Sequence, residues 1–269
     1  MHYISTRGGA PPVSFLDAVL AGLAPDGGLY VPQDWPTTLD REGFRSAVAT
    51  GHFQYGALNA LKAFAGDDLE WDEAAMLASE AYARPGAPTP WPAVVTPLVQ
   101  IGPGQWALEL FHGPSLSFKD VAMQLIGPLF DFALAKRDRR LTVMCATSGD
   151  TGGAAAEALK GRERIDLFIL IPKARVSDVQ RLFMTATGAA NVHALEIDGD
   201  FDACQAILKS LFADADFARR AALSAVNSVN WARIVAQSVY FHIAANALSG
   251  PGPVNFVVPT GNFGDAYSG

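Results

Sequence analysis

The sequence has few of the residues that build metal sites, disulfide frameworks or nucleic-acid-binding surfaces. Among its 269 residues only two are cysteines, Cys145 and Cys204. Both lie in apolar surroundings outside any CxxC pair, so we expect inert core thiols and neither a disulfide framework nor a metal site. The net charge is −7 and the 20 Lys and Arg residues are scattered. This argues against nucleic-acid binding, because phosphate neutralisation needs clustered cations.

Long apolar runs and targeting signals are also missing. No stretch reaches the about 18 consecutive apolar residues that suggest a membrane-spanning helix, and residues 1–8 lack a basic-then-apolar signal pattern. We therefore predict no membrane partner and a cytoplasmic location. The chain is nevertheless 50% hydrophobic, which is enough for a large core and more than one compact unit.

The predicted organisation changes near residue 90. Before it, Ser14 can cap a helix over 15–23, a short extended segment covers 29–32, and helices are expected at 53–64 and 72–82. The segment 84–92 contains four prolines in nine residues, which cannot continue a helix. It is the best candidate for a linker.

Beyond this segment, short apolar runs alternate with helical stretches. Strands are expected at 141–147, 166–172, 191–198 and 254–259. This alternation predicts an α/β fold with parallel sheet layers. Ligands in such folds bind beyond the carboxyl ends of strands, and two Gly-rich turns fall at those positions.

One lysine has unusual neighbours. Lys119 closes the run Leu-Phe-His-Gly-Pro-Ser-Leu-Ser-Phe and precedes an apolar stretch, 121–134, with the spacing of a packed helix. Such surroundings remove hydration and disfavour the ammonium form, and the free amine is the nucleophile of Schiff-base chemistry. Taken alone, a lysine near a helix start is more often solvated or paired with a carboxylate.

The two turns are suited to anions. Residues 147–153 follow a strand and precede a helix, so that hydroxyls and free helix amides can donate to a carboxylate or phosphate, and residues 259–265 repeat the arrangement. Neither is a Walker loop, and each alone is commonly just helix capping. Together with Lys119 they provide the parts to hold an aldehyde cofactor, anchor its phosphate and seat a substrate carboxylate.

These segments resemble the threonine synthase family. The similarity lies in Phe111–Asp120, Ala146–Gly152 and Gly261–Asp265, and extends to 3–8, 22–32, 197–204 and 227–230, so it covers essentially the whole chain. It implies a tryptophan-synthase-β-like fold, the type II fold of pyridoxal-phosphate enzymes, with helices on both faces of parallel sheets. The implied domains are a mainly helical N-terminal domain (1–92), part of a large cofactor domain (93–122 and 225–269) and a smaller mobile α/β domain (123–224).

The implied activity is that of a carbon–oxygen lyase in threonine biosynthesis. It converts O-phospho-L-homoserine and water into L-threonine and phosphate, with pyridoxal 5'-phosphate bound as a Schiff base to Lys119, which also moves protons between substrate carbons. The implied partner is this small-molecule substrate, and the implied assembly is a monomer or homodimer.

The resemblance also implies roles for individual residues. The cofactor would be held by Lys119, Phe118, Gly261, Asn262, Phe263, Gly264 and Asp265. The substrate carboxylate would meet Ser148, Gly149, Asp150 and Thr151, and its phosphate Lys173, Arg175, Asn227, Ser228, Asn230 and Arg233. For Lys173 and Arg175 a solvated loop, and for Phe118 a plain core position, explains the residue equally well.

Three functional hypotheses stay open. Because the chain ends at Gly269 where the family continues, the resemblance implies a fragment without the group that meets the pyridine nitrogen. The first hypothesis is an active lyase or a segment of one. The second is a catalytically silent module that keeps the lysine but holds no cofactor. The third is a serine/threonine dehydratase-like elimination with the same cofactor.

Overall fold

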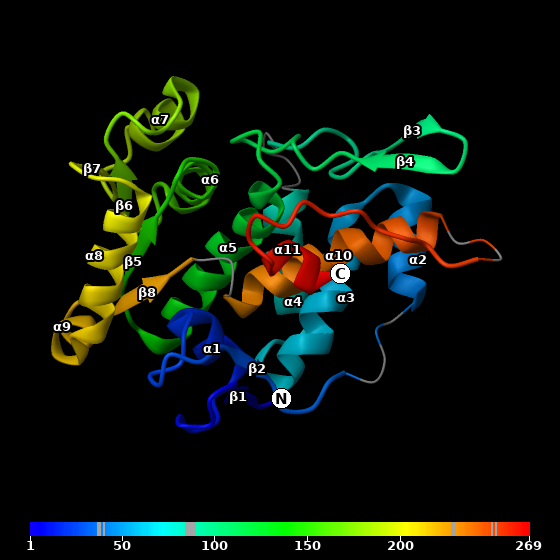
Figure 1. Ribbon diagram of the computed structural model, residues 1–269. Helices are drawn as coiled ribbons and strands as arrows, with labels where there is room; N and C mark the ends of the chain where they lie inside the picture. Colours follow the sequence, from blue (N-terminus) through cyan, green and yellow to red (C-terminus); the bar gives the residue numbers. More distant parts are fainter. Residues whose placement is uncertain (37–38, 40, 84–89, 227–229, 249, 251) are drawn as a thin grey trace.

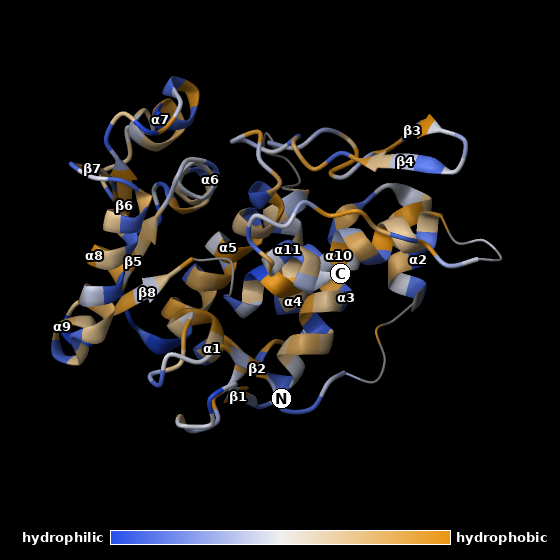
Figure 2. Ribbon diagram, in the orientation of Figure 1, coloured by the Kyte–Doolittle hydropathy of each residue, from blue (hydrophilic) through white to orange (hydrophobic). Residues whose placement is uncertain are grey.

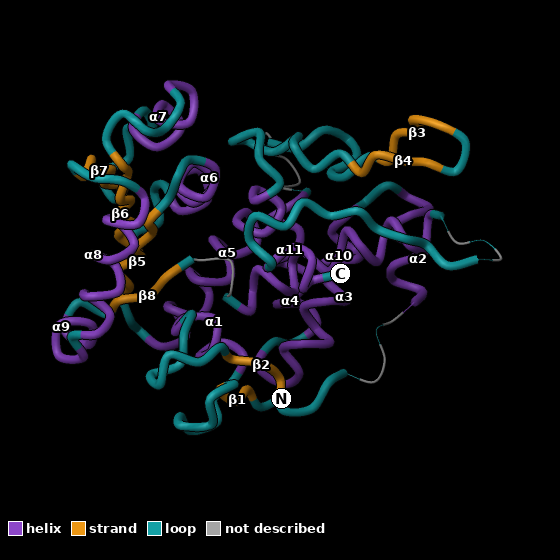
Figure 3. Tube along the Cα trace, viewed as in Figure 1, coloured by secondary structure: helices purple, strands orange, loops and turns teal. Residues whose placement is uncertain are grey.

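A four-stranded parallel sheet forms one side of the molecule. The computed structural model describes residues 1–36, 39, 41–83, 90–226, 230–248, 250 and 252–269. The strands lie in the order β7-β6-β5-β8 (Figures 1 and 3). Their bounds are β5 (Leu141–Ala146), β6 (Ile165–Pro172), β7 (Val192–Ile197) and β8 (Leu223–Ala225). The α/β class and the parallel pairing predicted from the sequence are confirmed.

Helices cover both faces of this sheet. Contacts to β5 and β6 come from α6 (Asp150–Leu159) on one face and from α8 (Phe201–Ala213) on the other (Figure 1). In Figure 2, α8 carries hydrophilic and hydrophobic residues side by side, as expected of a helix with one solvent face. The remaining helices of this part are α7 (Asp178–Thr185) and α9 (Ala215–Arg220).

A helical layer packs beside the sheet. It contains α1 (Phe15–Ala21), α2 (Arg41–Thr50), α3 (Phe53–Ala65), α4 (Trp71–Tyr82), α10 (Trp231–Ala247) and the short 3-10 helix η1 (Gly66–Asp68). Two antiparallel pairs complete it, β1 (Tyr3–Ser5) with β2 (Tyr30–Pro32), and β3 (Leu98–Gly102) with β4 (Gln105–Leu108). The predicted helices at 15–23, 53–64 and 72–82 are confirmed, including the Ser14 cap, whose side chain accepts a hydrogen bond from the Asp17 amide.

The helix α5 (Lys119–Arg137) joins the two layers. Its residues from 120 to 130 are all buried, as expected of a helix that is apolar around most of its circumference. It contacts α4 and α10 on one side and α6 on the other. Gly127 permits the approach to α6, because a Cβ there would lie 2.6 Å from the Ala158 carbonyl oxygen. The first residue of α5, Lys119, is therefore held between the sheet and the helical layer.

The strand predicted at 254–259 is wrong. These residues run as irregular chain in front of α10 (Figure 3), and Val257 is fully exposed. A ladder needs a neighbouring strand to accept and donate backbone hydrogen bonds, and none of the strands in the described part of the chain pairs with this segment. Phe256 instead packs edge-on against Phe241 of α10, with ring centroids 5.1 Å apart.

The predicted linker, domain boundaries and cytoplasmic location are not decided by the described residues. Most of the proposed linker, residues 84–89, lies outside the described residues, and the domain boundaries stay a prediction. Within the described ranges no helix is long and apolar enough to cross a membrane. The cytoplasmic location likewise stays a prediction.

Candidate active site

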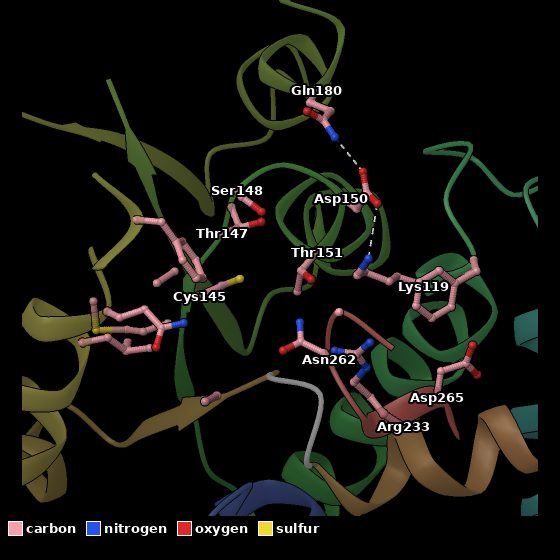
Figure 4. A pocket seen from close by; sticks show the side chains of 18 of the residues that line it. Lys119, Cys145, Thr147, Ser148, Asp150, Thr151, Gln180, Arg233, Asn262 and Asp265 are labelled. Carbon is pink, nitrogen blue, oxygen red and sulfur yellow. Dashed lines mark hydrogen bonds and ion pairs between the residues drawn. The ribbon is translucent and has the colours of Figure 1, made fainter. Parts of the chain in front are cut away.

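A cavity of about 520 Å³ lies where the carboxyl ends of β5 and β8 meet the starts of α5, α6 and α10. Its size is that of a small-molecule site. Lys119 enters it from the start of α5, and its side chain is 14% exposed (Figure 4). The cavity thus lies beyond the carboxyl ends of parallel strands, where the sequence placed function.

A buried carboxylate shapes the loop that presents Lys119. Asp120 is fully buried, and it accepts hydrogen bonds from the Ser115 amide at 2.8 Å, the Ser115 hydroxyl at 2.7 Å and the Ser117 amide at 3.4 Å. The loop includes Leu116 in the left-handed region at φ 58°, a costly conformation that the surrounding bonds must stabilise. Gly113 leaves room for Asp120, since a Cβ there would lie 2.4 Å from the Asp120 Cβ.

The first Gly-rich turn is organised by a threonine. The Thr147 hydroxyl accepts from the amides of Gly149 at 3.0 Å and Gly152 at 3.1 Å. Gly152 has no room for a side chain, because a Cβ would lie 2.3 Å from the Met184 sulfur. Two of the amides expected to bind an anion are therefore occupied within the turn, while Ser148, Asp150 and Thr151 line the cavity.

Among the described residues, Lys119 is hydrogen-bonded to one carboxylate, that of Asp150. Its Nζ lies 3.3 Å from Asp150 Oδ2 and 4.4 Å from the centroid of the Phe118 ring. Asp150 Oδ1 in turn accepts a hydrogen bond from the side-chain Nε2 of Gln180 at 2.7 Å (Figure 4). Burial lowers the pKa of Lys119, attraction to Asp150 acts in the opposite direction, and Arg233 lowers it further. The expected loss of hydration at Lys119 is confirmed.

A second cation is buried in the cavity wall. Arg233 is 2% exposed, its Nη1 donates to the Val226 carbonyl at 3.4 Å, and its Nε has no hydrogen-bond partner among the described atoms. Burial lowers the pKa of Arg233 to about 10, so the guanidinium remains charged at neutral pH. A buried charge with an unsatisfied donor is costly unless an anion joins it.

The second Gly-rich turn reaches the same cavity from the far end of the chain. Gly261, Asn262 and Asp265 line it, and the short helix α11 (Gly264–Ser268) follows. The Tyr240 hydroxyl donates to the Asp265 carboxylate and so ties α11 to α10. Burial raises the pKa of Asp265, while the hydrogen bond from Tyr240 and the nearby charge of Arg233 lower it.

The structure gathers most of the predicted site residues. The cavity is lined by Phe118, Lys119, Ser148, Asp150, Thr151, Arg233, Gly261, Asn262 and Asp265. Gly149, Phe263, Gly264, Lys173, Arg175 and Asn230 are not among the lining residues, and Asn227 and Ser228 lie outside the described residues.

Three of these exceptions have a clear placement. Lys173 and Arg175 are exposed in the turn after β6. Asn230 is fully buried and caps α10, where its Oδ1 accepts from the Ala232 amide and its Nδ2 donates to the Val19 carbonyl. Both ends of the Asn230 side chain are therefore hydrogen-bonded within the protein. This does not favour its predicted contact with substrate.

Sequence reasoning missed several cavity residues. Gln180 reaches Asp150 across 30 positions of the chain, and a single glutamine on an exposed helix gives no signal. Gln237 lines the cavity and Tyr240 holds Asp265. These two did have a signal, because Arg233, Gln237 and Tyr240 have the i, i+4, i+7 spacing of one helix face within an otherwise apolar run.

The described residues contain no group of three or more His, Cys, Asp or Glu placed to hold a metal ion. Both cysteines are buried free thiols, as predicted. The polar groups that line the cavity are instead the amines of Lys119 and Lys209, a guanidinium, hydroxyls, amides and two carboxylates. Such a set suits an organic anion.

Comparisons with known proteins cover the entire chain. Residues 2–82 match the family model described as threonine synthase N terminus, and residues 92–268 match the model described as pyridoxal-phosphate dependent enzyme. A threonine synthase of Pseudomonas aeruginosa is 46% identical over 270 residues, which are 100% of this chain and 56% of that protein.

Solved structures agree. The pyridoxal-phosphate-bound threonine synthase from Brucella melitensis superposes with a TM-score of 0.88 at 48% identity, over 100% of this chain and 56% of that one. Yeast threonine synthase gives a TM-score of 0.84 at 37% identity, over 99% and 54%. The chain thus spans just over half the length of these relatives.

Proposed function

We propose, since the chain belongs to the family of pyridoxal-phosphate-dependent enzymes, that it carries the lysine-bearing part of a threonine synthase. The reaction would convert O-phospho-L-homoserine and water into L-threonine and phosphate. The observation that supports this most directly is the meeting of Lys119, the turn at 147–152, Arg233 and the turn at 261–265 around one cavity. Lys119 and the two turns belong to the segments through which the sequence resembles that family.

The residues of the cavity fit the cofactor. Its aldehyde requires a lysine amine, and Lys119 is the lysine whose burial favours the neutral form. Its phosphate requires donors, and Gly261 and Asn262 of the second Gly-rich turn lie in the cavity wall. When bound, pyridoxal phosphate supplies a covalent attachment point and a ring that stores negative charge.

The chain's own residues would do the remaining work. Lys119 Nζ would hold and move protons at the substrate carbons from its place at the start of α5. The hydroxyls of Ser148 and Thr151 would orient the substrate carboxylate, and Arg233 would attract its phosphate. Phe118, whose ring lies beside Nζ, would help to exclude water from the amine.

The test of cofactor binding is a spectrum. Adding pyridoxal phosphate to the 269-residue chain should produce a visible absorbance band shifted from that of the free cofactor, and borohydride reduction should leave the cofactor's mass on the peptide that contains Lys119. Lys119→Ala should abolish both signals. Lys173→Ala, at an exposed lysine outside the cavity lining, is the matched control and should keep them.

The outcome separates the hypotheses. An unshifted spectrum in the wild-type chain would contradict cofactor binding and favour the silent module. If cofactor binds, phosphate released from O-phospho-L-homoserine supports the synthase. Ammonia released from threonine, without phosphate release, would support the dehydratase-like elimination instead.

A further inference from the structure

The only carboxylate hydrogen-bonded to Lys119 among the described residues is Asp150, whose side chain is itself held by a hydrogen bond from the Gln180 side chain. Asp150 Oδ2 lies 3.3 Å from Lys119 Nζ, and Asp150 Oδ1 accepts from Gln180 Nε2 at 2.7 Å. The contact joins α7 to α6 across Gly149. A Cβ at Gly149 would lie 2.3 Å from Gln180 Cδ, so only glycine lets the Gln180 side chain cross the turn and reach the carboxylate.

The other charged groups around Lys119 do not replace Asp150. Arg233 of α10 is a like charge, which disfavours the ammonium form. Asp265 of α11 is attractive but is engaged by the Tyr240 hydroxyl. Cys145 of β5 is neutral, because burial raises the pKa of its thiol to about 12. Burial lowers the pKa of Lys119, and among the neighbouring charged groups Asp150 is the one that most favours the ammonium form.

We infer that Asp150, positioned by Gln180, is the counter-ion that holds Lys119 as an ammonium in the cofactor-free protein and so sets the pH at which its amine becomes reactive. Asp150 acts through Lys119 and is a positioning residue. As a consequence, the Lys119 amine becomes a nucleophile only when its ion pair with Asp150 is broken or when the ammonium loses its proton. This inference rests on the proposed role of Lys119 as the nucleophile.

The test needs no cofactor. Cofactor-free protein is treated with the N-hydroxysuccinimide ester of acetic acid, which acetylates neutral amines, releases N-hydroxysuccinimide and gives the amine proton to the buffer. The rate at Lys119 is followed by peptide mass spectrometry from pH 6 to 11. Asp150→Asn keeps the shape and the contact with Gln180 but removes the charge. In Asp150→Asn the midpoint of the profile of Lys119 acetylation rate against pH should move down by about one pH unit. The rate at neutral pH should rise about tenfold.

The control is Asp178→Asn, at an exposed aspartate in the first turn of α7. It makes the same change in net charge at a residue that is outside the cavity lining and is not among the groups that act on Lys119, so it should leave the profile unchanged. Gln180→Leu keeps the charge of Asp150 but frees its side chain, so it should shift the midpoint in the same direction by a smaller amount. Circular dichroism on each variant establishes that it is folded.

A measurement on the wild-type protein supports these variants. Asp150 is 46% exposed, so salt should screen its attraction for Lys119. Raising NaCl from about 0.01 M to 1 M should move the wild-type midpoint toward that of Asp150→Asn, whose own profile should respond less. If Asp150→Asn and wild type have the same midpoint, or if salt moves neither, the inference is wrong. Either result leaves cofactor binding by Lys119 to be judged by its own spectrum.

Discussion

Asp120 offers a sharp test of how the lysine loop is held. Its carboxylate is fully buried and accepts from the Ser115 amide, the Ser115 hydroxyl and the Ser117 amide. Asp120→Ala would leave these donors buried without an acceptor. Each unsatisfied buried donor costs about 1–3 kcal/mol, and bonds to a charged acceptor are worth about 1.5–3 kcal/mol. Because the bond from Ser117 is long, we expect a loss of about 3–5 kcal/mol in the free energy of unfolding.

Asp120→Asn separates the hydrogen bonds from the charge. The amide oxygen can take the place of Oδ2, which accepts from both backbone amides, and the NH₂ group can donate to the Ser115 hydroxyl, which then turns its own proton elsewhere. Burial raises the pKa of Asp120, with the hydrogen bonds from Ser115 and Ser117 opposing it. A neutral side chain avoids that desolvation, so we expect a loss of about 1 kcal/mol or less.

The assay is urea unfolding at neutral pH, followed by far-UV circular dichroism. The sign of the pH dependence provides a further check. A carboxyl whose folded pKa is above its unfolded value of about 3.9 binds protons more tightly in the fold, so its contribution is present at lower pH and declines as pH rises from that value toward the folded pKa. Asp120→Asn should lose this part of the dependence. Equal losses for the Ala and Asn variants would refute the hydrogen-bond argument.

Two further outcomes follow from the packing. Gly152→Ala should cost about 1–3 kcal/mol of unfolding free energy, because its Cβ would meet the Met184 sulfur and Thr147, whereas Gly252→Ala, with open space around it, should be close to neutral in the same urea assay. Burial lowers the pKa of His242, so the fold binds its proton less tightly, and stability should fall as pH drops through the unfolded pKa of about 6.5. Urea midpoints at pH 7.5 and 5.5 should differ less in His242→Gln, and an unchanged difference would count against this assignment.

The elements that could be predicted from the sequence are those that the local pattern of apolar residues determines. Continuous apolar runs produce β5 and β6, which are buried on both faces, and the apolar stretch after Lys119 becomes the buried helix α5. The run at 254–258 has similar composition yet forms no strand. Strand formation depends on a partner at hydrogen-bonding distance, and composition does not report whether that partner exists.

Side-chain contacts between distant elements could not be predicted in the same way. The sequence indicated that residues 147–153 present free amides, but Thr147 occupies those of Gly149 and Gly152. It gave no reason to join Gln180 to Asp150, because the contact depends on how α7 lies over a turn that has no Cβ at Gly149. The polar face of α10 was within reach, since Arg233 and Tyr240 share one side of an apolar helix.

The balance of charges in the cavity explains why Lys119 can be kept in its unreactive ammonium form. The whole chain has a net charge of −7, yet three cations, Lys119, Lys209 and Arg233, line the cavity together with two carboxylates, Asp150 and Asp265. Each carboxylate also accepts a hydrogen bond from a neutral side chain, Asp150 from Gln180 and Asp265 from Tyr240. These hydrogen bonds partly satisfy the carboxylates and weaken their attraction for a cation.

Arg233 remains charged because its pKa of about 10 is well above neutrality. Of Lys119 and Arg233, Lys119 is therefore the residue that loses its proton first. A phosphate-bearing ligand at Arg233 would supply negative charge to the cavity, reduce the repulsion between the two cations, and favour the ammonium form of Lys119. Binding of a phosphate at Arg233 and reactivity of the Lys119 amine would then oppose each other through the charge of Arg233.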